Sequence, residues 1–210
     1  MAFKVIGFFA AKIKSPYLLA AVLSLVPLTE IKGSILYVAS ADVNLWLAAL
    51  CAFLPTLLLA ALEALFLPKL FRALDSHPRC RRAAGLVTDR IAKAADKMLK
   101  TSENSEKRMD RLFFGVYSFV ALPLPLTGIW AGGILAAMLG LDKGRTFFAL
   151  TAGNFTAGGI VLAVALLAGD YASAVLDLFC VLVLLFLLVP IVREVVKHRR
   201  RKGIIKKDRL

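Results

Sequence analysis

Long apolar segments place the strongest constraint on how this chain folds. Three of them, at about 44–71, 145–168 and 171–192, are long enough to cross a bilayer, which takes about 20 apolar residues per helix. Of the 210 residues, 60% are hydrophobic, and the mean hydropathy is +0.77. A soluble domain is nearer half apolar, so the excess must face lipid. The sequence therefore predicts an all-α integral membrane protein, with one membrane domain over residues 1–210.

Basic residues gather in three places and indicate which side of the membrane each loop occupies. Of the 27 Lys and Arg residues, 23 lie in 1–14, 72–111 and 193–210. Basic loops stay on the cytoplasmic side. We therefore expect a cytoplasmic basic helical linker over 72–111 and a cytoplasmic basic tail over 193–210. Anionic membrane lipids account for the net charge of +13 beside apolar spans, so no nucleic-acid partner is expected.

Two further apolar segments are too short or too interrupted to be ordinary spans. Residues 15–29 are short, and residues 112–141 are broken near their middle. Proline removes a backbone donor and glycine permits a tight reversal. Both segments are therefore predicted to turn back within the membrane as re-entrant helical hairpins. The predicted structural hairpin breakers are Pro27, Gly33, Pro123 and Pro125.

An internal repeat supports this interpretation. Sliding the chain by 98 residues gives five identities across 27–39, including Pro27 on Pro125 and Thr29 on Thr127. The coinciding helix breakers predict an inverted repeat of a re-entrant helical hairpin plus a transmembrane helix, an arrangement that many transporters use. An extra C-terminal transmembrane helix follows. The predicted parts are a first repeat with an N-terminal helix at 1–71, the linker 72–111, a second repeat at 112–168, the helix 171–192 and the tail 193–210.

Charged residues within the apolar segments are the first candidates for function. Glu30 and Lys32 stand at the first predicted tip, where a charge is costly unless it lines a cavity or pathway. On the functional interpretation, Glu30 binds and releases a coupling proton and Lys32 binds an anionic group. On the alternative interpretation, the two residues pair with each other or with backbone groups and hold the tip together.

The second predicted tip has no charge but carries Thr127, Gly128 and Trp130. Helix N-termini beyond the break would present N–H donors to an anion or a polar substrate group. Alternatively, its glycines allow helices to pack closely. Within 145–168, Asn154 must find a polar partner. The remaining candidates are Thr29 beside the first tip and two further intramembrane carboxylates, Glu63 and Asp177.

No constellation of catalytic or metal-binding residues is visible. The cysteines are an odd set without close spacing, and both histidines lie in polar segments. Phosphate-binding glycine loops are absent. We therefore expect no metal, no cofactor and no enzymatic activity.

The two tips read Glu30-Ile31-Lys32-Gly33 and Pro123-Leu124-Pro125-Leu126-Thr127-Gly128-Ile129-Trp130. They resemble the small multidrug export family of bacterial membrane proteins, whose patterns are Glu-x-Arg-Gly and Pro-x-Pro-Gly-Thr-Gly with a following Trp. Lys32 replaces arginine, and Leu126 replaces glycine. The likeness covers about residues 15–168. It implies a bacterial-type inner membrane location and a fold related to the DedA and VTT lipid-transport proteins, some of which are thought to move undecaprenyl phosphate or phospholipids.

The predicted function is that of a membrane transporter or lipid translocase, coupled to protons, which moves an anionic lipid headgroup such as undecaprenyl phosphate or phospholipid. Export of small amphiphilic drugs is one alternative, and a non-transporting membrane scaffold or assembly factor is another. The expected partners are the lipid or small amphiphilic substrate, protons and anionic membrane lipids. Faces of small residues also allow a homodimer.

Overall fold

The computed structural model describes residues 12–41, 43–76, 105–124 and 127–168, together with the single positions 174, 178 and 181. Within these residues the protein is all-helical, with six helices and no strand. Several predicted segments fall outside them. These are the N-terminal segment 1–11, most of the linker 72–111, almost all of the helix 171–192, and the tail 193–210.

Two long helices form the frame of the molecule. They are α4, Leu45–Ser76, and α8, Lys143–Ala168. Both are long and apolar enough to cross a membrane, as predicted for 44–71 and 145–168. Pro55 and Pro68 lie inside α4 without ending it, which apolar helices tolerate when neighbouring helices pack against them.

Four shorter helices form two consecutive pairs. The first pair is α2, Pro16–Leu25, and α3, Glu30–Ala39. The second pair is α6, Ser105–Ala121, which continues past residue 111, and α7, Ile129–Met138. The chain therefore leaves the helix at 26–29, and also at 122–124 and 127–128, the two places where the sequence predicts an interruption.

One predicted helix breaker is misplaced. Gly33 lies within the first turn of α3, and its N–H donates to the carbonyl oxygen of Thr29 at 2.7 Å. The first interruption thus ends at Glu30, because the backbone already closes a helical hydrogen bond there. Pro27 and Pro123 do stand in the non-helical connections, and Pro125 lies outside the described residues.

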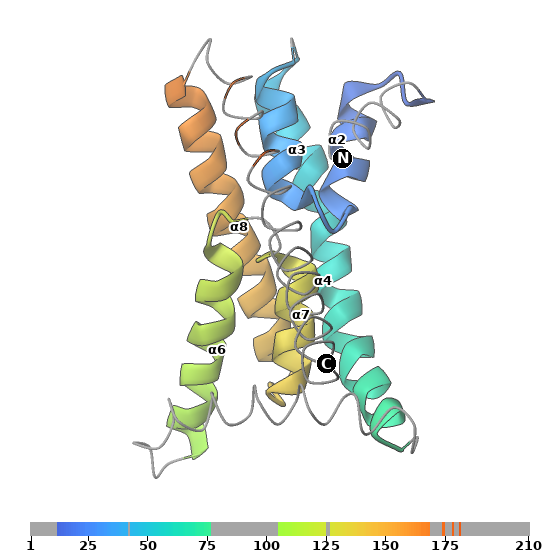
Figure 1. The fold of residues 1–210 in the computed structure, drawn as a ribbon, viewed down its shortest axis with the longest axis vertical. Coiled ribbons are helices and arrows are strands. Elements are labelled where there is room, and N and C mark those ends of the chain that lie inside the picture. The colour runs from blue at the N-terminus through green and yellow to red at the C-terminus, as the bar shows by residue number, and fades with distance from the viewer. Residues whose placement is uncertain are drawn as a thin grey trace, which may run out of the picture.

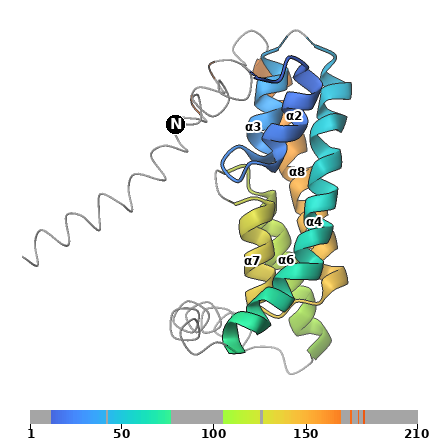
Figure 2. The ribbon, with the colours of Figure 1, turned by 90° about the vertical axis from the view of Figure 1, so that its right-hand side faces the viewer.

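The two helix pairs occupy opposite ends of the molecule. In Figure 1, α2 and α3 lie in the upper half, α6 and α7 lie in the lower half, and the connection within each pair points to mid-height. The long helices α4 and α8 run the full length in opposite directions. Figure 2 shows the same arrangement from the side, so the two connections meet near the centre of the molecule.

Two hydrophobic clusters lie above and below this centre. One is built on α3 with the N-terminal half of α4 and the C-terminal half of α8, around Ile35. The other joins α6 and α7 to the remaining halves of α4 and α8, around Val116. Most of the buried polar side chains of the described residues lie at this centre or just below it. We call the polar layer the set of the buried Thr29, Glu30, Lys32, Thr56, Glu63 and Asn154 together with the half-buried Thr127.

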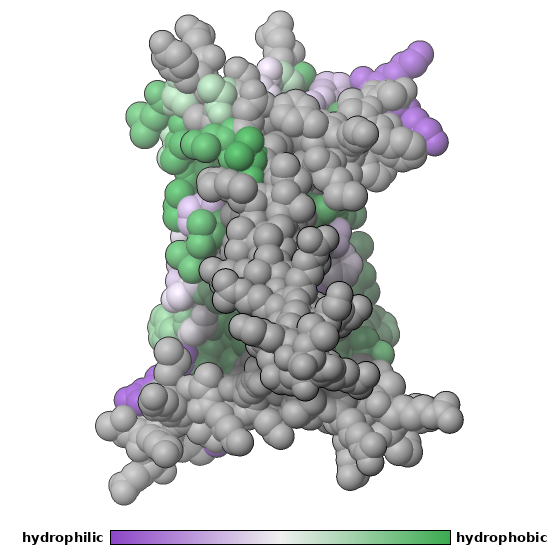
Figure 3. Space-filling model, in the orientation of Figure 1, coloured by the Kyte–Doolittle hydropathy of each residue, from purple (hydrophilic) through white to green (hydrophobic). Residues whose placement is uncertain are grey.

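The outer surface is apolar around mid-height. In the view of Figure 3, green residues flank the centre, and the deep purple residues lie toward the two ends. Large exposed side chains on the long helices contribute to this surface, among them Leu54, Leu58 and Phe155. Such a belt suits a lipid environment, because water would penalise so much exposed apolar area.

Candidate functional site

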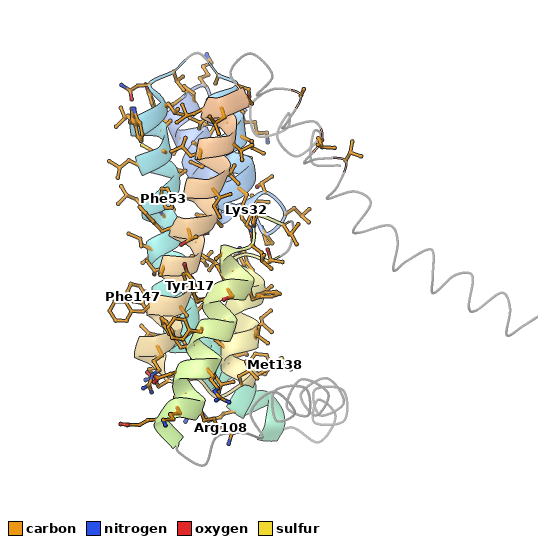
Figure 4. The ribbon with its side chains drawn as sticks, turned by 90° about the vertical axis from the view of Figure 1, so that its left-hand side faces the viewer. Lys32, Phe53, Arg108, Tyr117, Met138 and Phe147 are labelled. Atoms are coloured by element: carbon orange, nitrogen blue, oxygen red, sulfur yellow. The ribbon has the colours of Figure 1, made fainter. Side chains whose placement is uncertain are left out.

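Lys32 joins the two interhelical connections. Its Nζ atom donates hydrogen bonds to the carbonyl oxygen of Leu124 at 2.8 Å and to Oγ1 of Thr127 at 3.1 Å. It also lies 3.4 Å from Oε2 of Glu30. Figure 4 shows Lys32 at the height where the two connections meet. An ammonium has three N–H donors, so these three acceptors occupy all of them.

Glu30 reaches the other tip through an unusual backbone conformation. Its φ is 49°, the only positive φ among the described residues other than glycine. Its carboxyl group packs directly on Gly128, where a Cβ atom would overlap it. Gly128 is the N-cap of α7, so the carboxylate sits at the positive end of that helix dipole. The left-handed conformation costs about 1–3 kcal/mol, which the contacts of this buried tip must offset.

The hydroxyls of Thr29 and Thr127 hold the two connections in matching ways. Oγ1 of Thr29 donates to the carbonyl oxygen of Leu23 at 2.6 Å, at the end of α2. Oγ1 of Thr127 lies 2.8 Å from the carbonyl oxygen of Leu122 and 2.9 Å from that of Leu124, at the end of α6. Each threonine thereby donates a hydrogen bond to a carbonyl oxygen at the C-terminal end of the preceding helix, where the regular helical pattern stops.

Trp130 makes the second crossing between the halves. Its Nε1 donates to the carbonyl oxygen of Leu25 at 3.0 Å. Lys32 therefore binds the backbone of the second connection, and Trp130 binds the backbone at the start of the first. Sequence alone places Trp130 at its tip but does not reveal this partner.

Thr56 and Asn154 connect the two long helices. Nδ2 of Asn154 donates to Oγ1 of Thr56 at 2.9 Å, and Thr56 donates to the carbonyl oxygen of Phe53 at 2.7 Å. The two residues are 98 positions apart, the same offset that relates Thr29 to Thr127. Asn154 thus finds the polar partner that its place in an apolar span requires.

Glu63 is the third buried ionisable side chain of the described residues. It is 5% exposed, and neither carboxyl oxygen has a hydrogen-bond partner there. The carboxyl group packs on Gly133 of α7, where a Cβ atom would overlap it. The sequence identifies Glu63 as an intramembrane acid, but it does not reveal that Glu63 contacts Gly133. The adjacent Gly132 and Gly133 in a short apolar helix are the sequence feature that could have indicated a close approach there.

The structure thus brings together most of the predicted site. Glu30, Lys32, Thr127 and Gly128 are in direct contact, while Trp130 and Thr29 fasten the surrounding backbone. Asn154 lies on another pair of helices, and Asp177 falls outside the described residues. Among the described residues, no group of three or more metal-ligating side chains is found.

A comparison with known protein families bears on this arrangement. A family model described as "Putative small multi-drug export protein" matches residues 30–160, from the first residue of α3 into α8. The chain belongs to this family. No curated protein and no solved structure matches the chain. Its membership of the small multi-drug export family and its two long apolar helices together identify a membrane protein.

Proposed function

We propose that the chain is a multi-pass transporter of the inner membrane that exports small amphiphilic cations in exchange for protons. One observation carries the proposal. Lys32 has used all three of its donors, whereas the polar layer buries two carboxyl groups, of Glu30 and Glu63. A cationic substrate would find a carboxylate there, that of Glu30, and an anionic headgroup would find no free cation among the described residues of this layer. The description of the family, a small multi-drug export protein, agrees with this choice.

In the proposed cycle, Glu30 binds either a proton or the substrate cation, but not both together. A site with this exclusive choice couples the two fluxes, because each ligand displaces the other. Protonation of Glu30 also weakens its attraction for Lys32, so that the contact between the two tips loosens. The halves then exchange their access to the two sides of the membrane, as in other transporters with repeated halves.

The proposed topology places the α2–α3 and α6–α7 pairs in the bilayer as re-entrant hairpins that enter from opposite faces. Each pair precedes one long helix, and the tips of the pairs meet at mid-height. These observations support an inverted repeat, an arrangement that the DedA and VTT proteins would share. The basic linker over 72–111 and the tail over 193–210 would then be cytoplasmic.

Transport of an anionic lipid headgroup, such as undecaprenyl phosphate or phospholipid, is the second candidate. One observation favours it: Thr29, the N-cap of α3, makes no side-chain capping hydrogen bond, and Gly128, the N-cap of α7, has no side chain that could make one. First-turn N–H groups without a capping side chain suit a phosphate. The proposal includes no enzymatic step. Its partners are the substrate, protons, anionic lipids and, through small-residue faces, a possible second copy.

Flux measurements with the full chain in proteoliposomes test the proposal. The probes are radiolabelled tetraphenylphosphonium, under an imposed pH gradient, and a fluorescent phospholipid analogue. We expect gradient-driven uptake of the cation, reduced about 100-fold in Glu30→Gln. The matched control is Glu106→Gln, which changes an exposed glutamate in the first turn of α6 and should leave the flux unchanged.

Each other outcome rejects the proposal in its own way. Cation uptake that Glu30→Gln leaves unchanged at every pH removes the coupling role of Glu30. Movement of the phospholipid analogue without movement of the cation supports lipid transport. If neither probe moves but the protein binds a partner, the scaffold interpretation is correct.

A further inference from the structure

Among the described residues, Glu63 is buried beside no group that stabilises a negative charge. Its two carboxyl oxygens are inaccessible to solvent and accept no hydrogen bond within the described residues. The room that it occupies exists because Gly133 lacks a side chain. An ionised carboxylate in such a place is very costly, and in practice such a group takes up a proton. The geometry therefore indicates a neutral carboxylic acid.

The neighbouring helices supply Glu63 with no cation. Lys32, the buried lysine of α3, already uses all three donors elsewhere. Glu30 lies close enough to repel Glu63 electrostatically when both are ionised. Arg145, at the start of α8, pairs with Asp110 and Asp142. Among the side chains that the structure describes, the ionisable ones on α4 itself and on the helices packed against it (α2, α3, α7 and α8) are Tyr17, Glu30, Lys32, Tyr37, Cys51, Glu63, Lys69, Arg72, Lys143 and Arg145.

Glu30 and Glu63 contact the same short helix at successive heights. Glu30 packs on Gly128, the N-cap of α7, and Glu63 packs on Gly133. Five residues of helix correspond to about 7–8 Å of rise. Since α7 runs from mid-height to the lower end in Figure 1, Glu63 lies between Glu30 and the end of the molecule from which α6 starts.

We propose that Glu63 is a second proton-carrying site of the exchanger, which receives protons from the end where α6 starts and passes them to Glu30. The inference rests on the proposed function. In the transfer, the O–H bond of the Glu63 carboxyl group breaks, water conveys the proton, and an O–H bond forms on the Glu30 carboxylate. Glu63 then takes a proton from water at that end. No oxidation or reduction takes place.

The first test separates coupling from substrate binding. Tetraphenylphosphonium uptake is measured in two ways with the full chain in proteoliposomes: under a pH gradient, and as exchange of labelled for unlabelled cation without a gradient. In Glu63→Gln, which keeps the shape of the side chain, we expect gradient-driven uptake to fall about 100-fold. Exchange without a gradient should stay within about twofold of the wild type. Gradient-driven uptake that persists in Glu63→Gln overturns the proposal.

The second test does not depend on transport. Infrared spectroscopy of the purified full chain separates a protonated carboxyl group from a carboxylate by its C=O stretching band. At neutral pH we expect this band in the wild type, in Glu30→Gln and in Glu63→Asp, and its loss in Glu63→Gln. A band that remains in Glu63→Gln overturns the proposal. If the wild type moves no cation yet shows this pattern, the transport function fails while the protonation of Glu63 stands.

A pair of glycine variants completes the design. Gly133→Ala places a methyl group where the Glu63 carboxyl group lies, so the acid must move. We expect reduced gradient-driven uptake in this variant. Gly159→Ala is the matched control, because nothing lies within 4 Å of its added Cβ atom. Equal uptake in the two variants would contradict the proposed placement of Glu63.

Discussion

The two connections at the centre of the molecule occupy matching places in the two helix pairs but differ in chemistry. Residues 26–29 lead into Glu30 and Lys32, which carry the charges of the first half. Residues 122–128 carry no charge, yet they supply what those charges contact: the carbonyl oxygen of Leu124, the hydroxyl of Thr127 and the bare backbone of Gly128. The first half thus provides the charged groups, and the second half provides the site that receives them.

This division places the charges in one helix pair and the groups that they contact in the other. The hydroxyl groups of Thr29 and Thr127 each donate to a carbonyl oxygen at the end of the preceding helix. At the offset of 98 residues, however, Glu30 corresponds to Gly128. A second carboxylate in place of Gly128 would meet the first at the centre, where like charges repel. Glycine removes that conflict and also leaves space for the Glu30 side chain.

Loss of the Lys32 ammonium should have the largest effect on this asymmetric contact. Lys32→Met leaves Glu30 buried without its cation, and we expect the free energy of unfolding to fall by about 3–5 kcal/mol. Denaturant unfolding in detergent micelles measures it. The control is Lys69→Met, an exposed lysine over the ring of Phe66, expected to cost less than about 1 kcal/mol.

The double variant Glu30→Gln with Lys32→Met sharpens this test. With no carboxylate left to neutralise, part of the stability lost in Lys32→Met should return, so the two substitutions are not additive. Equal losses in Lys32→Met and Lys69→Met, or strict additivity in the double variant, would mean that the ion pair does not hold the tips together.

Filling the space at Gly128 should have the second-largest effect on stability. In Gly128→Ala the added methyl group overlaps the Glu30 carboxyl group, and overpacking of this kind costs about 1–3 kcal/mol. Gly115→Ala in α6 is the matched control, because its Cβ atom meets nothing within 4 Å. There the helix should gain up to about 1 kcal/mol. Thermal unfolding should show that Gly128→Ala lowers the stability and that Gly115→Ala raises it. Changes in the same direction would contradict the proposed contact between Glu30 and Gly128.

These contacts differ in how far the sequence could predict them. The interruptions at 26–29 and 122–128 follow from local chemistry, since Pro27 and Pro123 act on their own turn. The sequence predicts that Asn154 needs a polar partner, but it does not identify Thr56 as that partner. By contrast, the contact of Glu63 with Gly133 depends on which face of α4 meets α7, two helices distant in sequence. The sequence predicts a helix breaker at Gly33, but Gly33 lies within α3, because glycine permits a turn without requiring one.

The hydrogen bond between the two long helices should contribute less to the free energy of unfolding than the central ion pair does. A double-mutant cycle with Thr56→Val and Asn154→Leu should give a coupling energy of about 0.6 kcal/mol, and no more than about 1.7 kcal/mol. Such hydrogen bonds contribute little because the unfolded chain also finds partners within the membrane. Unfolding of the four proteins in micelles measures the coupling, and purely additive effects would show that the Asn154 to Thr56 hydrogen bond stabilises neither helix.

The N-terminal caps of the two long helices differ in the opposite sense from the tips, because here the charged residue belongs to the second half of the chain. We expect substitutions at these caps to have the smallest effect on stability. Oδ1 of Asn44 accepts from the N–H of Leu47 at 3.0 Å, and 98 residues later Oδ1 of Asp142 accepts from the N–H of Arg145 at 3.0 Å. This backbone hydrogen bond, aided by the Arg145 guanidinium, holds the pKa of Asp142 below its usual value.

A carboxyl group whose pKa is lower in the folded state stabilises the fold at pH values above its unfolded-state pKa of about 3.9. This stabilisation is lost as the pH falls through the folded-state pKa. Asp142→Asn should therefore flatten the acid limb of the thermal stability curve by less than about 1 kcal/mol, while Asn44→Asp steepens it. If the melting temperatures of both variants follow the wild type below pH 5, the charge of the second cap contributes nothing, and the two caps are equivalent.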